Sequence, residues 1–121
     1  MISLEAFGDL SATPVGPFKS KPTTVTEGQT EALNILWSSR DESTSIGVWE
    51  CTPGRFTANR TAAGEYCHVI SGRATVSNSD GTASRDICTG DLLVLPQGWT
   101  GEWTIHEHMR KLFIISASPA E

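Results

Sequence analysis

Glu65 is the residue of this chain whose surroundings most suggest chemistry. It opens the segment EYCHVIS, which alternates as a β-strand does, so Glu65, Cys67 and Val69 share one face. If that face borders an apolar interior, the carboxylate has a raised pKa and can carry a proton, which would make Glu65 a candidate catalytic residue. The alternative is that Glu65 is paired with a lysine or arginine and holds a pocket together. Cys67 is a candidate ligand contact, although buried thiols generally pack as small apolar residues.

Two tryptophans and a lysine are further candidates for contacts with a small molecule. Trp49 and Trp103 carry indole N–H groups that can orient a ligand against an aromatic wall, and the alternative for both is packing in the core. Lys111 opens the segment KLFIIS and shares a face with Phe113, which we therefore include in the ligand-binding set. The charge of Lys111 can pair with Glu65 or with an anionic ligand, and the alternative is a solvated strand end.

The segment His106-Glu107-His108 has the spacing of a metal-binding pair, since residues i and i+2 of a strand share a face. We expect it instead at the surface, in a hairpin before the final strand. Three cysteines without a CxxC spacing favour free thiols in a reducing compartment over a disulfide framework. No basic cluster precedes an apolar stretch at the N-terminus, so we expect no secretory signal and a cytoplasmic location.

Short strands separated by turn signals account for most of the chain after residue 33. Asn78-Ser79-Asp80-Gly81 indicates a hairpin, because Asp-Gly tolerates the positive φ of tight turns. About eight strands at intervals of roughly 8–12 residues are typical of an all-β sandwich or barrel. Before them, Pro14, Pro17 and Pro22 indicate an extended arm that packs on the domain. The expected strands are residues 34–38, 46–51, 65–71, 73–78, 82–88, 92–96, 102–106 and 111–116.

Length and charge exclude several classes of protein. The 121 residues suit one compact domain. The formal net charge is −5 and no Lys/Arg run exceeds Arg110-Lys111, so we expect no nucleic-acid partner. The longest apolar run, Leu112 to Ile115, is far shorter than the roughly 20 residues of a membrane-spanning helix, so we also expect no membrane partner.

The order of the motifs resembles that of the cupins, which are double-stranded β-helix jelly rolls. Glu65 with Gly72 seven positions later matches the end of the first cupin motif, G-x5-H-x-H-x3–4-E-x6-G. Gly90 and Pro96-Gln97-Gly98 match the start of the second, G-x5-P-x-G-x2-H-x3-N. More narrowly, GVWECTPGRF, EYCHVISGRATV and GDLLVLPQGWTGEWTI resemble short, RmlC-like single-domain cupins related to ureidoglycine aminohydrolases, most of which have no assigned activity. The resemblance implies a jelly-roll barrel over residues 34–118, preceded by an arm over residues 1–33.

The histidines of these motifs are missing. Counting forward from the first glycine of the motif places Arg60 and Ala62 at the histidine positions, and counting back from the glutamate places Asn59 and Thr61 there. Gly101 stands where the third histidine belongs. Because one carboxylate cannot hold a transition metal tightly, we expect no metal ligands and no cofactor at this site. Arg60 can instead bind a carboxylate where the metal would be, and the alternative is a solvated loop position.

The resemblance implies a small cupin of unassigned activity that binds a small polar metabolite, with a carboxylate or amide, in its barrel. The main alternative is a metal-dependent hydrolase or isomerase related to ureidoglycine aminohydrolase. Metal-free acid–base catalysis and a purely structural dimer module are further alternatives. Tyr66, His68 and Ile70 form an outer face that is less polar than a solvated one, which predicts a homodimer formed by sheet packing.

Overall fold

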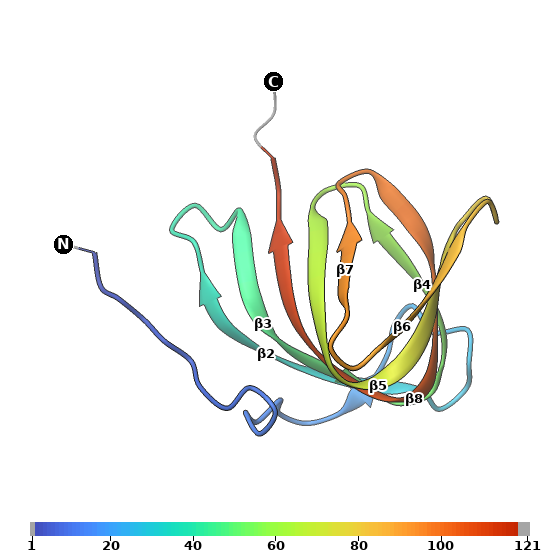
Figure 1. Ribbon diagram of the computed structural model, residues 1–121, viewed down its shortest axis with the longest axis horizontal. Helices are drawn as coiled ribbons and strands as arrows, with labels where there is room; N and C mark the ends of the chain where they lie inside the picture. Colours follow the sequence, from blue (N-terminus) through green and yellow to red (C-terminus); the bar gives the residue numbers. More distant parts are fainter. Residues whose placement is uncertain (1, 119–121) are drawn as a thin grey trace.

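The computed structural model describes residues 2–118, and every regular element within them is a β-strand (Figure 1). The strands are β1 (Lys19–Ser20), β2 (Thr30–Ser38), β3 (Thr44–Cys51), β4 (Gly54–Arg60), β5 (Gly64–Asn78), β6 (Ser84–Cys88), β7 (Leu92–Leu95) and β8 (Trp99–Ser116). All their pairings are antiparallel. The all-β jelly-roll barrel expected from the sequence is confirmed.

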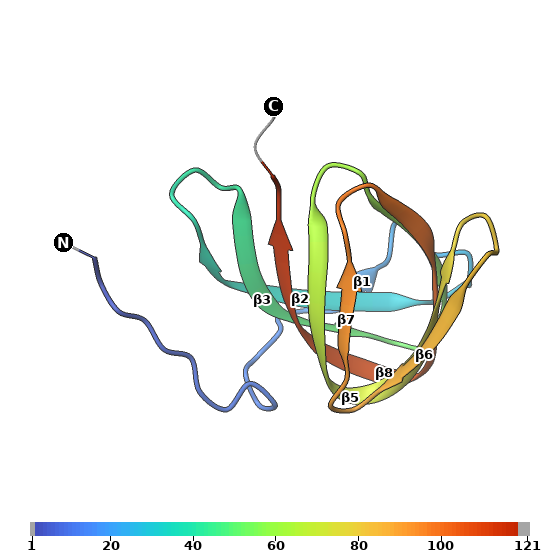
Figure 2. The same cartoon turned by 45° about the horizontal axis from the view of Figure 1, so that its top comes forward.

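Two long strands shape the barrel. β5 and β8 pair along most of their lengths, from Gly64 opposite Ser116 to Asn78 opposite Gly101. The first half of β5 also pairs with β7, which lies beside it in Figure 2, and its second half pairs with β6. β8 in turn pairs with β4 through its first half and with β3 through its second. Because each long strand changes partner midway, the sheet curls around one core that includes Trp49, Cys67 and Trp103.

Gly72 bends β5 where its pairing register with β8 shifts. Its φ is 96°, and a Cβ atom there would lie 2.4 Å from the backbone oxygen of His108, so only glycine fits. The sequence predicted separate strands at 65–71 and 73–78, and at 102–106 and 111–116. In the structure each pair forms one bent strand, because the irregular segment disturbs the ladder without ending it.

Two further details differ from the sequence-based expectation. His106-Glu107-His108 lies inside β8 and not in a hairpin, although its side chains are exposed as expected. Both histidines bond to side chains of neighbouring strands: the Nε2 atom of His106 lies 2.8 Å from the hydroxyl of Thr75, and that of His108 lies 2.6 Å from Glu50 Oε1. Residues 54–60, for which no strand was predicted, form β4.

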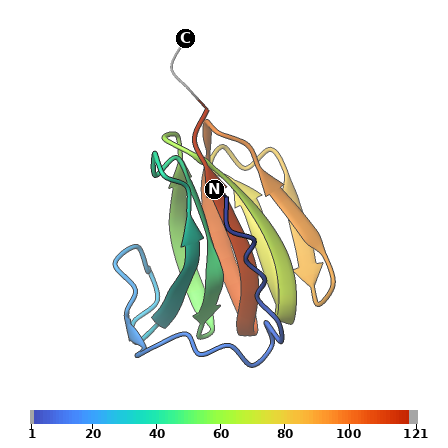
Figure 3. The ribbon, with the colours of Figure 1, turned by 90° about the vertical axis from the view of Figure 1, so that its left-hand side faces the viewer.

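The segment before β1 is anchored to the outer face of the sheet, as Figure 3 shows. Val15 is buried there together with Ala32 and Val48. Arg110 Nε donates a hydrogen bond to the carbonyl of Leu10 at 2.9 Å, and the amide of Asn34 donates one to the carbonyl of Pro14 at 2.9 Å. The division of the chain at residue 33 stays a prediction. No helix in the described part of the chain is long and apolar enough to cross a membrane.

Candidate functional site

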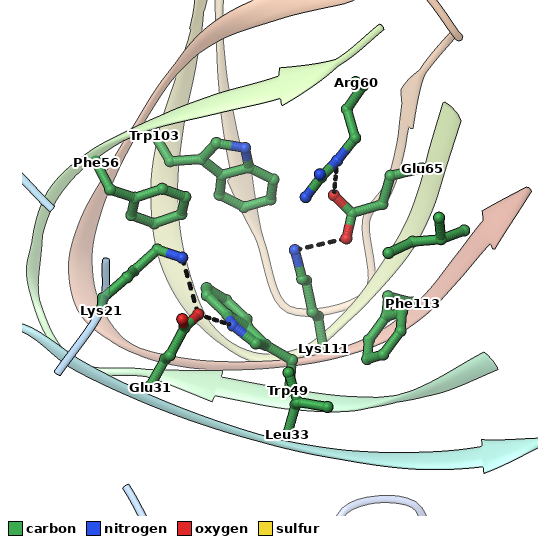
Figure 4. A pocket seen from close by; sticks show the side chains of 11 residues that line it. Lys21, Glu31, Leu33, Trp49, Phe56, Arg60, Glu65, Trp103, Lys111 and Phe113 are labelled. Carbon is green, nitrogen blue, oxygen red and sulfur yellow. Dashed lines mark hydrogen bonds and ion pairs between the residues drawn. The ribbon is translucent and has the colours of Figure 1, made fainter. Parts of the chain in front are cut away.

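A buried carboxylate held between two cations forms the centre of the candidate site. Glu65 in β5 and Lys111 in β8 both point into the barrel, and Figure 4 shows their side chains meeting there. Lys111 Nζ lies 3.0 Å from Glu65 Oε2, and Arg60 Nε donates a hydrogen bond to Glu65 Oε1 at 3.0 Å. The Glu65 and Lys111 side chains are 3% and 5% exposed, whereas that of Arg60, at the end of β4, is 29% exposed. We call these three residues the clamp.

The clamp is ionised at neutral pH. Burial by itself raises the pKa of Glu65, but attraction and hydrogen bonds from Lys111 and Arg60 outweigh it and lower that pKa to about 2. Burial likewise favours neutral Lys111, but attraction to the Glu65 carboxylate and a hydrogen bond with it raise the pKa of Lys111 above the usual value. Of the two alternatives for Glu65, the structure therefore has the paired, charged carboxylate and not a protonated acid.

Three aromatic rings form a wall beside the clamp. Lys111 Nζ lies 4.2 Å from the ring centroid of Trp49 and 4.3 Å from that of Trp103. Phe56 stacks on Trp103, with centroids 5.9 Å apart and an interplanar angle of 13°, while Trp49 meets Trp103 edge-on at 6.2 Å. These cation–π contacts offset part of the hydration that the buried ammonium has lost.

A second ion pair lies on the other side of the same space. Lys21, directly after β1, is 2.8 Å from Glu31 in β2, and its ammonium sits 4.1 Å from the ring centroid of Phe56. The indole N–H of Trp49 donates a hydrogen bond to Glu31 Oε1 at 2.8 Å, which fixes the orientation of this ring. The N-terminal segment therefore contributes a charged side chain to the barrel interior.

These groups surround a cavity of about 130 Å³. Six of the seven predicted site residues line it, namely Trp49, Arg60, Glu65, Trp103, Lys111 and Phe113. Cys67 is not among the lining residues and is fully buried in the core. The catalytic role of Glu65 and the ligand contacts of the others stay predictions. Sequence reasoning missed the lining residues Lys21, Glu31, Leu33 and Phe56, and it left Ile115 out of the ligand-binding set although Ile115 alternates with Lys111 and Phe113 on one strand. Glu31 and Leu33 carried the same signal, as alternating residues of one strand.

The inward-facing residues do not fit the metal site of the cupin motifs. On β4 the inward positions are Phe56, Ala58 and Arg60. A side chain at Gly101 has no space, because its Cβ would lie 2.1 Å from the backbone oxygen of Ser77 and 2.2 Å from the Trp99 ring. Within residues 2–118 no three His, Cys, Asp or Glu side chains converge on one point. The remaining motif carboxylate, Glu65, already faces two cations, which would repel a metal ion.

The reactivity of the three cysteines tests which of their side chains are buried in the core. Burial raises the pKa of Cys51 and of Cys67 to about 12, so both stay protonated thiols. Cys88 is exposed, although the charge of Asp91 raises its pKa as well. We expect one thiol per native chain to react with a disulfide reagent such as DTNB at pH 8, and a Cys88→Ser variant to show no fast reaction. Fast reaction of two or three thiols in the folded protein would contradict this packing.

The comparisons with known proteins agree with the cupin fold. Residues 38–113 match the EutQ-like cupin domain family. The structure of a DUF861-family protein of unknown function from Pseudomonas syringae pv. tomato has a TM-score of 0.70 at 24% identity, over 84% of this chain but 43% of that one. The Clostridium difficile EutQ protein gives 0.64 at 18% identity, over 77% and 72% of the two chains. A DUF861-family protein from Thermotoga maritima gives 0.51 at 29% identity, over 55% and 73%. No curated protein matches.

The chain therefore belongs to the EutQ-like cupin family, because the matched residues are more than half of its length. This confirms the resemblance to the cupins. The similarity to these solved structures establishes the fold. The chain spans less than half of the Pseudomonas protein, so this similarity does not assign an activity to the chain.

Proposed function

We propose that this cupin binds a small, carboxylate-bearing polar metabolite in its barrel, without the usual histidine-ligated metal. The observation that supports the proposal is an excess of positive charge around one cavity in the barrel. Three cationic side chains, Lys21, Arg60 and Lys111, line it together with two carboxylates, Glu31 and Glu65. The surplus cation shares the cavity with an aromatic wall, which favours an anion with a flat or apolar remainder.

Arg60 is the group best placed to receive that anion. Its Nε atom donates to Glu65 and its Nη1 atom donates to the carbonyl of Asn59, whereas its Nη2 atom has no hydrogen-bond partner among the described residues. Because Arg60 is partly exposed at the end of β4, its guanidinium can meet a ligand without moving the buried half of the clamp. Lys111, which is buried and lines the same cavity, adds positive electrostatic potential that attracts an anion bound at Arg60.

The ionised clamp favours binding over proton transfer. A carboxylate with a pKa of about 2 is a weak base, and the raised pKa of Lys111 leaves little free amine to act as a nucleophile. The metal-dependent alternative requires three or four converging donors, and the residues present do not fit that requirement.

Calorimetric titration with small carboxylates, such as acetate, pyruvate, glycolate and benzoate, tests the proposal. We expect at least one to bind with one site per chain, and Arg60→Gln to weaken that binding about tenfold or more, as expected for loss of a charge-assisted hydrogen bond. Arg55→Gln is the matched control, since the Arg55 side chain is 55% exposed and pairs with surface Glu102. Equal affinity in the wild type and Arg60→Gln, or binding only of neutral analogues, would contradict the proposal.

A further inference from the structure

An apolar strip runs from the cavity to the surface on the inner face of the sheet. Leu33 in β2 lies opposite Trp49 in β3, and both side chains line the cavity (Figure 4). Ile35 follows two residues later on the same face of β2. Leu33 is 50% exposed and Ile35 is 46% exposed. The cavity wall therefore continues onto the surface over two large apolar side chains.

The strip also extends across the sheet from β2 to β8. Ile35 lies opposite Gly47 in β3, and Gly47 lies opposite Phe113 in β8. A Cβ atom at Gly47 would lie 2.8 Å from the Phe113 ring, so this ring lies over the glycine and extends toward Ile35. Two residues after Phe113, Ile115 continues the same face of β8. We call four residues the lip, namely Leu33, Ile35, Phe113 and Ile115.

The lip adjoins the guanidinium that is proposed to hold a carboxylate. Ile115 lies directly opposite Glu65 in the pairing of β8 with β5. Glu65 Oε1 accepts the hydrogen bond from Arg60 Nε, and Arg60 and Ile115 both line the cavity. An anion bound at Arg60 therefore has an apolar surface beside it, and that surface leads out of the barrel.

The cavity has room for little more than the head of such a ligand. Its volume of about 130 Å³ corresponds to about four water-sized groups at roughly 30 Å³ each. A carboxylate group and the carbon next to it take up that room. A longer chain therefore leaves the cavity along the wall that opens at Leu33, where it covers the exposed part of the lip.

We propose that the ligand is an amphipathic carboxylate, with its head at Arg60 and an alkyl or similarly apolar tail on the lip. This inference rests on the function proposed above, since it needs a carboxylate in the cavity, and it narrows the ligand to one with an apolar tail. A tail that covers Leu33 and Ile35 gains the free energy of apolar burial. A small hydrophilic acid such as glycolate leaves both side chains in water.

Calorimetric titration with straight-chain carboxylates from acetate to hexanoate tests this inference. We expect the dissociation constant to fall about twofold to fourfold for each added methylene, as partial to full burial of a methylene implies. Hexanoate should then bind at least about tenfold more tightly than acetate. Hexan-1-ol, which has the tail without the charge, should bind at least about tenfold more weakly than hexanoate.

Substitutions in the lip show whether the tail lies there. Leu33→Thr and Ile35→Thr should each reduce the advantage of hexanoate over acetate about threefold or more. Val94→Thr is the matched control and should leave this advantage unchanged, because Val94 is 52% exposed but lies on the outer face of β7. Threonine keeps the branched shape that strands favour, and circular dichroism checks that each variant is folded.

The possible outcomes separate this inference from the proposed function. Acetate that binds through Arg60 as tightly as hexanoate would overturn the lip and leave the carboxylate site intact, as would lip variants that keep the full gain from chain length. Failure of every carboxylate to bind would overturn both proposals. Leu33→Thr or Ile35→Thr could instead weaken self-association in sedimentation velocity without changing the chain-length series. A second copy of the chain would then occupy the lip, and the inference would be wrong.

Discussion

Glu65→Gln lowers the free energy of unfolding by about 3–5 kcal/mol, because it leaves Lys111 as a buried cation without a counter-charge. Arg60 would then face Lys111 as a like charge in the same small space. Folded domains are commonly stable by only about 5–15 kcal/mol, so the loss is a large share of the total. Urea unfolding followed by tryptophan fluorescence measures it.

Two further variants show whether the unpaired charge of Lys111 causes the loss of stability in Glu65→Gln. Lys111→Met in the Glu65→Gln background removes the unpaired cation, and we expect it to recover much of the lost stability. Glu102→Gln removes a surface carboxylate that lies 3.6 Å from Arg55, with side chains 41% and 55% exposed, and should cost less than about 1 kcal/mol. A Glu65→Gln effect no larger than that of Glu102→Gln would mean that the clamp does not exist in solution.

The same carboxylate makes stability depend on pH. The pKa of Glu65 falls from 4.5 to about 2 on folding, so its contribution is complete above pH 4.5 and is lost as the pH falls toward 2. Lys111 has a raised pKa, so its contribution is complete below its ordinary pKa of 10.5 and is lost as the pH rises beyond it. Glu65→Gln should therefore flatten the acid limb of the stability profile, which urea midpoints between pH 2 and pH 5 would show.

Gly101→Ala has the second large effect, because its Cβ meets the backbone oxygen of Ser77 at 2.1 Å and the ring of Trp99 at 2.2 Å. A rotamer change of Trp99 relieves only the second contact, so the pairing of β5 with β8 must shift. We expect a loss of about 3 kcal/mol in thermal or urea unfolding, at the upper end for overpacking.

Gly8→Ala is the control, because nothing lies within 4 Å of a Cβ built there. It should change stability by less than about 0.5 kcal/mol when both variants are measured as monomers. If Gly101→Ala were as stable as Gly8→Ala, the position of the third motif histidine would have room for a side chain, and the description of the lost metal site would be wrong.

The sequence predicted most of the barrel because local signals agree with the fold. Alternating apolar residues and Asp-Gly at 80–81 marked strands and a hairpin that the structure contains. β4 was missed because Arg55, Thr57 and Asn59 point outward and Phe56 is its single large apolar side chain. The sequence predicts a strand end at Gly72, because a glycine that ends a strand and a glycine that bends one look alike in the sequence.

The sequence predicts those residues of the candidate site that strand alternation places on one face. That rule brought together Lys111 and Phe113, and the family motif supplied Glu65. Lys21 could not be found in this way, since its contact with Glu31 depends on how a proline-rich segment folds back over the barrel. The sequence does not predict whether Glu65 is paired, because a charge partner is set by tertiary geometry, which has no period in the sequence.

A carbon-13 NMR titration of the Glu65 side-chain carboxyl tests the central claim most directly, since it reports the ionisation of that one group in the folded protein. The clamp predicts an apparent pKa of about 2, and a clear rise of that pKa in Lys111→Met. A Glu65 carboxyl that titrates at or above 4.5 in the wild type would show that the two cations do not hold it, and would contradict the account of the site.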